Sequence, residues 1–105
     1  MAQPVRTFPT YYSPIASSYQ DLTVQGTAVG LTVPTSPTAR SAIITVETDQ
    51  VRFTVDTTTP SSTKGHLLNA GDLLELGNTE MLSNARFIKV TSDATLRVTY
   101  FGGGV

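Results

Sequence analysis

Short runs of alternating apolar and polar residues, separated by turn signals, most limit what this chain can fold into. The clearest run spans 94–100, and its inward side chains are Ala94, Leu96, Val98 and Tyr100. Such alternation is typical of a half-buried strand, because successive residues of a strand point to opposite faces. Similar runs recur about every 8–12 residues, a spacing typical of antiparallel sandwiches and barrels. We therefore expect an all-β fold: a small antiparallel β-sandwich or jelly-roll-like barrel of about seven or eight short strands.

The composition agrees with an all-β domain and excludes several partners. Threonine, a strand-forming residue, accounts for 18 of the 105 residues. Only 14% of residues are charged and the net charge is −1, against about 25% charged residues in an average domain. This balance gives no basic field for nucleic acid or an anionic membrane, so we expect neither as a partner. A length of 105 residues suits a single domain with one hydrophobic core.

Local signals predict the connections between strands. The runs 41–47 and 51–56 are separated by three residues, which predicts a hairpin. In the second run we expect Val51, Phe53 and Val55 to face inward and the residues between them to face outward. The polar stretch 57–65 predicts an exposed loop, and 77–84 could hold one helical turn.

The first 21 residues differ from the rest. They contain half of the prolines, at Pro4, Pro9 and Pro14, and proline cannot sit in a helix interior or a central strand. We therefore divide the chain into an extended arm, 1–21, and a β-sandwich domain, 22–105. The arm is too apolar for a comfortable disordered tail. Its candidate partner-binding residues are Phe8, Tyr11, Tyr12, Ile15 and Tyr19.

The residues needed for catalysis are sparse. His66 is the single histidine, and a triad can be drawn with Ser61 or Ser62 and with Asp72 across a hairpin. With nine serines in the chain, such a drawing carries little weight, and a histidine that bonds loop backbone is the favoured interpretation. We expect no catalytic residues, no cofactor and no enzymatic activity.

A metal site is not expected either. The chain has no cysteine, and its carboxylates are dispersed over turns. Aspartate in a turn commonly bonds its own backbone two residues on, which is the role expected for Asp49, Asp56, Asp72 and Asp93. The arginines are also spread, which suits individual surface contacts better than a nucleic-acid stripe; they include Arg40, Arg52, Arg86 and Arg97.

From Ala42 to Tyr100 the chain resembles a group of small structural proteins of tailed bacteriophages. The resemblance rests on the order of several blocks: 42–47, 51–56, 59–66, Gly71-Asp72, 86–88 and 94–100. It covers about 60 residues. The chain departs from the pattern at Thr57, where the group usually carries glycine, a residue suited to positive φ. The resemblance implies a virion component and brings no catalytic residues with it.

These observations favour a non-enzymatic capsid decoration, or cement, protein that binds and stabilises the shell of major capsid protein. Its expected location is the virion, assembled in the host cytoplasm, and its expected state is a homo-oligomer, with a trimer favoured by capsid symmetry. The alternative is a head–tail connector, or a tail or fibre-associated module with a host-binding role. A cupin-like enzyme is a third reading, which the single histidine counts against.

Overall fold

The described part of the chain forms eight strands and one short helix. The computed structural model describes residues 15–35 and 38–102. In chain order the elements are β1 Ile15–Val24, β2 Val29–Gly30, β3 Ala39–Glu47, β4 Val51–Thr54, β5 His66–Leu68, β6 Leu73–Leu76, α1 Thr79–Asn84, β7 Arg86–Lys89 and β8 Ala94–Gly102. Among the described residues there is no helix of the length and apolarity that a membrane crossing requires.

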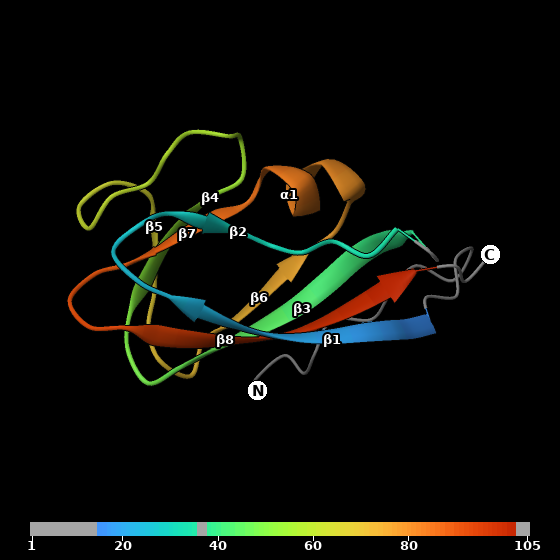
Figure 1. Cartoon of the computed structure of the whole chain (residues 1–105), viewed down its shortest axis with the longest axis horizontal. Helices are drawn as coiled ribbons and strands as arrows, with labels where there is room; N and C mark the ends of the chain where they lie inside the picture. Colours follow the sequence, from blue (N-terminus) through green and yellow to red (C-terminus); the bar gives the residue numbers. More distant parts are fainter. Residues whose placement is uncertain (1–14, 36–37, 103–105) are drawn as a thin grey trace, which may run out of the picture.

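The strands form two antiparallel sheets of four. The first sheet has the order β1-β8-β3-β6 and the second sheet β2-β7-β4-β5. Each early strand pairs with a late one (β1 with β8, β2 with β7, β3 with β6, β4 with β5), as in a long hairpin rolled up on itself. This is the strand order of a jelly roll, an eight-stranded double sheet built from two Greek keys. The expected all-β sandwich is confirmed, and Figure 1 shows the long strands β1, β8 and β3 side by side.

The core lies between the sheets. The alternation expected in 94–100 is confirmed, since Ala94 is 1% exposed and the other three inward residues are fully buried. These side chains meet buried residues from both sheets, among them Ala42, Ile44, Val46, Val51 and Phe87. Burial of this apolar surface is the main favourable term for the fold.

Tyr100 brings a polar group into this core, and the group has partners. Its hydroxyl donates to Gln20 Oε1 at 2.6 Å, and the same oxygen accepts from Thr32 N at 3.3 Å. Burial raises the pKa of Tyr100 to about 12, because the phenolate would lose its hydration. Gln20 therefore ties β1 to the segment that follows β2.

The hairpin expected between 41–47 and 51–56 is wrong. β3 belongs to the first sheet and β4 to the second, so the three residues between them turn a corner. β3 has a neighbour on each side, β8 and β6, which leaves no edge on which β4 could pair. Thr48 makes the corner with a φ of 75°, a conformation uncommon for a β-branched residue.

The loop 57–65 is less exposed than its composition predicts. Pro60 within it is buried, and Arg52 of β4 holds it by donating from Nε to Ser62 O and from Nη1 to Gly65 O, both at 2.9 Å. The loop therefore packs against the second sheet.

Thr54 shows the consequence for the neighbouring strand. It was expected to face solvent, but it is only 8% exposed, and its hydroxyl donates to the carbonyl oxygen of Thr58. Val51, Phe53 and Val55 do pack on the core, as expected.

The domain boundary expected between residues 21 and 22 falls inside a strand. β1 begins at Ile15 and pairs with β8 along its length, with an irregularity between Ala16 and Ser18. The sandwich therefore begins no later than residue 15. The helical turn expected in 77–84 is confirmed as α1, which Asn78 caps by accepting from Met81 N at 2.8 Å.

Candidate functional site

The outer face of the first sheet gathers the polar and apolar side chains that could meet a partner. The register places Tyr19, Asp21 and Arg97 on this face, together with Ile43 and Leu73. These residues come from all four strands, and their alternating neighbours point into the core. We call this surface the outer face.

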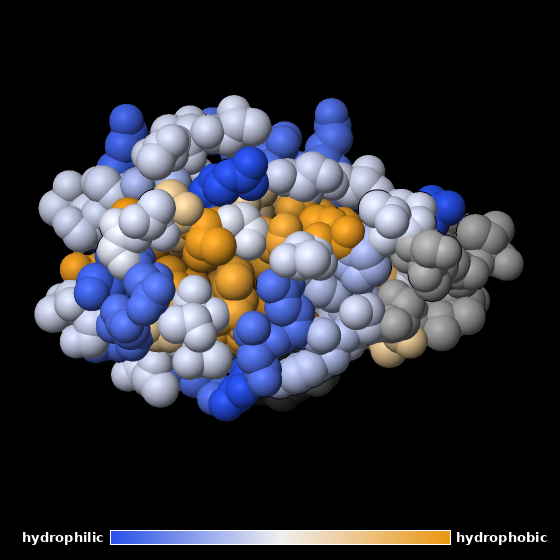
Figure 2. Space-filling model, viewed as in Figure 1, coloured by the Kyte–Doolittle hydropathy of each residue, from blue (hydrophilic) through white to orange (hydrophobic). Residues whose placement is uncertain are grey.

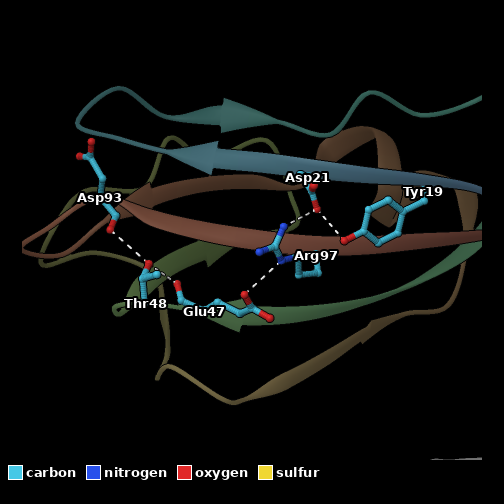
Figure 3. Close-up of polar contacts among 6 residues, drawn as sticks. All are labelled: Tyr19, Asp21, Glu47, Thr48, Asp93 and Arg97. Atoms are coloured by element: carbon cyan, nitrogen blue, oxygen red, sulfur yellow. Dashed lines mark hydrogen bonds and ion pairs between the residues drawn. The ribbon is translucent and has the colours of Figure 1, made fainter.

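Arg97 stands at the middle of a polar cluster on the outer face (Figure 3). Its Nη1 lies 2.9 Å from Asp21 Oδ1, and its Nε donates to Glu47 Oε1 at 3.1 Å. Tyr19 donates its hydroxyl to the same Asp21 oxygen at 2.6 Å. The guanidinium therefore joins strands β1, β8 and β3 across the sheet.

The groups of this cluster shift one another's pKa values. Hydrogen bonds from Tyr19 and Arg97 hold the pKa of Asp21 below its usual value, because they favour the carboxylate. The same carboxylate raises the pKa of Tyr19 above its usual value. Asp21 and Glu47 in turn raise the pKa of Arg97. In this cluster one guanidinium is shared by two carboxyl groups.

Apolar groups flank the cluster at the two edges of the sheet. Tyr19 on β1 is 58% exposed and Leu73 on β6 is 46% exposed. Three strand spacings separate these two edges, about 14 Å. Exposed tyrosine and leucine beside locally paired charges suit contact with another protein, where large side chains provide most of the binding energy.

The five candidate arm residues are not brought together among the described residues. Phe8, Tyr11 and Tyr12 lie outside them. Ile15 pairs with Gly102 through its backbone. Tyr19 is exposed on β1, as a partner-binding residue would be.

The structure does not assemble the triad drawn around His66. The expected hairpin of His66 with Asp72 is absent, because β5 and β6 belong to different sheets. Asp72 Oδ2 instead accepts from Asn69 N at 2.7 Å, within a turn. The His66 ring lies 5.3 Å from the Phe53 ring, centroid to centroid.

Of the four aspartates expected to bond backbone two residues on, only Asp56 does so, whereas Asp49 and Asp72 bond backbone at other spacings. Asp49 accepts from Gln50 N, Asp56 from Thr58 N and Asp72 from Asn69 N. Asp93 instead pairs with the side chain of Lys89 at 3.1 Å. Within residues 15–35 and 38–102, no three histidine or acidic side chains group in a way that could hold a metal ion.

Sequence reasoning missed the cluster itself. Arg97 was expected to make an individual surface contact, but it is shared by two carboxylates. Arg52 and Arg86 donate instead to backbone carbonyl groups. The sequence signal was present in the outward positions of the strands, yet only the register brings residues 21, 47 and 97 together.

Comparison with known proteins adds no relative: no family model, curated protein or solved structure matches the chain. In the described part of the chain, a shallow hollow is lined by Arg40, Gly77, Asn78 and Thr79.

Proposed function

We propose that the protein is a capsid decoration protein that binds the outside of a bacteriophage shell and stabilises it. The observation that carries the proposal is the outer face, on which exposed Tyr19 and Leu73 flank charges that are already paired with one another. Such a face can lie against protein at a smaller desolvation cost than a face of unpaired charges, since its ions keep their partners. The jelly roll, an architecture that also builds viral capsid domains, supports the same conclusion.

The proposal has a definite set of partners. The partner is the major capsid protein, and copies of the chain associate on the shell, with the trimer favoured by capsid symmetry. Asp21 and Glu47 outnumber Arg97 in the cluster, which disfavours nucleic-acid phosphates. We propose no enzymatic activity, no cofactor and no membrane partner for the protein. The protein acts in the virion, after assembly in the host cytoplasm.

Binding to shells tests the proposal directly. Purified chain is mixed with undecorated capsids of the phage that encodes it, and the bound fraction is measured after sedimentation. We expect saturable binding and, in electron cryo-microscopy, density repeated over the whole shell. Density at one vertex would instead identify the connector or tail alternative, and absence of binding would contradict both.

A pair of matched variants tests the outer face. Tyr19→Ala removes an exposed aromatic group from the outer face, and we expect the dissociation constant for shells to rise at least tenfold, the effect of about 1.4 kcal/mol. Leu67→Ala is the control, because Leu67 is similarly exposed, at 43%, but lies on β5 of the second sheet. Equal effects of the two changes would move the interface away from the outer face.

Removal of residues 2–14 tests the arm separately. The deletion stops before β1, so the strand keeps its full length. We expect weaker shell binding, because Phe8, Tyr11 and Tyr12 would no longer supply aromatic anchors. Unchanged binding would contradict the role of the arm and leave the Tyr19 result standing.

A further inference from the structure

β1 has a long edge with no strand of the described residues beside it. It spans ten residues and pairs only with β8, whereas the other three edge strands, β6, β2 and β5, have four residues or fewer. Within the described parts of the chain, the backbone groups of residues 16–24 have no hydrogen-bond partner outside β8. Unpaired N–H and C=O groups in such a row are a template for another strand.

The usual protections of an edge strand are missing from β1. Its sequence, IASSYQDLTV, contains no lysine and no proline. Its one charge, Asp21, is paired with Arg97 at 2.9 Å. The ladder with β8 is irregular only between Ala16 and Ser18, so residues 18–24 form a regular edge. Apart from Asp21, no residue of this stretch carries a charge that would repel an added strand.

The surface beside this edge is apolar. In Figure 2 apolar side chains gather between β2 and β1. Val29, Leu31 and Val33, in β2 and the segment after it, are partly buried against the core, and the Gln20–Thr32 hydrogen bond holds that segment next to β1. A molecule that pairs with β1 would cover part of this surface as well.

We propose that the occupant of the edge is a second copy of the chain, paired antiparallel through β1 about a two-fold axis perpendicular to the sheet. Such an axis keeps the two outer faces on the same side, so residues of the same face stand opposite each other. The two first sheets then form one eight-stranded sheet, β6-β3-β8-β1-β1-β8-β3-β6. A contact of this kind is self-complementary and closes at two copies.

The side chains of Tyr19 and Asp21 favour one register of the β1–β1 pair. If Asp21 stood opposite Asp21 of the second copy, two like charges would face each other, which is destabilising. If Tyr19 stood opposite Tyr19, Asp21 would face the irregular stretch around residue 17. With the axis at Gln20, Tyr19 stands opposite Asp21 of the second copy, and the ladder stays within residues 18–22. This register repeats between copies the Tyr19–Asp21 contact that each copy already makes at 2.6 Å.

The two-fold contact does not require a shell and is independent of the proposed function. On a shell the two-fold contact would join one trimer of the chain to the next. In solution, without a shell, it gives a dimer. Sedimentation equilibrium of the full chain over a range of concentrations should show monomer and dimer. A monomer at every concentration, or a trimer, would overturn the pairing.

A charge change with a matched control locates the contact. Tyr19→Asp places a carboxylate opposite Asp21 at both ends of the pair, and we expect the dimer dissociation constant to rise at least tenfold. Thr99→Asp adds the same charge to the same face one strand further in, on β8 directly beside Tyr19, and we expect less than a threefold change. Circular dichroism establishes that both variants are folded. Equal effects, or none, would overturn the assignment to β1.

Disulfide trapping tests the register, since the chain has no cysteine of its own. Under mild oxidation, a mixture of Tyr19→Cys and Asp21→Cys chains should form a mixed cross-linked dimer, because directly opposite residues lie within disulfide reach. A mixture of Thr99→Cys and Asp21→Cys chains should not. Efficient self-cross-linking of Tyr19→Cys alone, or no cross-link in the first mixture, would overturn the register.

Discussion

Two threonines take a backbone conformation that favours glycine. Thr48 has a φ of 75° and Thr57 a φ of 73°, in the left-handed region, which costs a non-glycine residue about 1–2 kcal/mol. Thr57 stood out in the sequence only as a departure from the glycine of the group that the chain resembles, and its conformation was not predicted. The strain at Thr48 was not predicted either, because the corner it makes was interpreted as a hairpin turn.

Thr57→Gly should therefore stabilise the protein. We expect the free energy of unfolding to rise by about 1 kcal/mol, since the relief of strain exceeds the entropic cost of glycine. Thr59→Gly is the control: Thr59 is exposed in the same loop and has no positive φ, so it should lose stability. Urea denaturation measures both, and a loss in Thr57→Gly would contradict the argument.

Tyr100 makes stability depend on alkaline pH. Its pKa is about 12 in the folded protein because it is buried, against about 10 in an unfolded chain. Between these values the folded state holds a proton that the unfolded state has lost, so stability is full below pH 10 and falls as pH rises towards 12. We expect a loss of about 2 kcal/mol across this window.

The same experiment on Tyr100→Phe isolates this effect. Contributions from the other side chains are common to both proteins. The difference in unfolding free energy between the two chains should therefore shrink above pH 10. A difference that stays constant from pH 9 to 12 would show that Tyr100 does not control the alkaline loss.

Strands whose apolar and polar residues alternate could be predicted from the sequence, whereas strands that form only because they pair with a distant strand could not. β8 and the last three residues of β1, 22–24, follow from side-chain periodicity. The first part of β1 does not, because its residues 16–21 are mostly polar and become a strand by pairing with β8. The apolar–polar alternation of residues 29–33 continues past the end of β2 at Gly30, since Thr32 bonds the Gln20 side chain instead of a neighbouring strand. The length of a connection does not show whether the two strands it joins are neighbours in one sheet or belong to different sheets.

The ends of β8 and β3 approach too closely for a side chain at Gly102. A Cβ there would overlap the carbonyl oxygen of Thr38 and lie 3.1 Å from the Cα atom of Ala39. We expect Gly102→Ala to lower the free energy of unfolding by about 2–3 kcal/mol, as overpacking does. Gly77→Ala should change it little, because a Cβ there meets nothing within 4 Å. Thermal unfolding followed by circular dichroism separates the two.

At the scale of the whole molecule, the nested pairing determines how the chain reaches its fold. Only β4 and β5 pair with a near neighbour in sequence; β1 must find β8 from the other end of the described chain. The candidate site depends on the same long-range pairing, which is why Tyr19 could be expected at a surface while its cluster with Arg97 and Glu47 could not.

Folding should accordingly be slow for a chain of this length. Non-local strand pairing must pay the entropy of loop closure before its contacts form, and all-β proteins of this kind fold in milliseconds to seconds. Stopped-flow refolding, monitored by tyrosine fluorescence, should show this range. Relaxation in microseconds would contradict the nested order.

The pairing of Ile15 with Gly102 also has a mechanical consequence. Tension applied through these two residues would pull β1 and β8 apart from one end, so that their hydrogen bonds break one after another instead of sharing the load. A molecule tethered by its two ends would therefore yield at low force. Load carried through the outer face would be spread over four strands at once, which is the arrangement that the proposed binding to a shell would use.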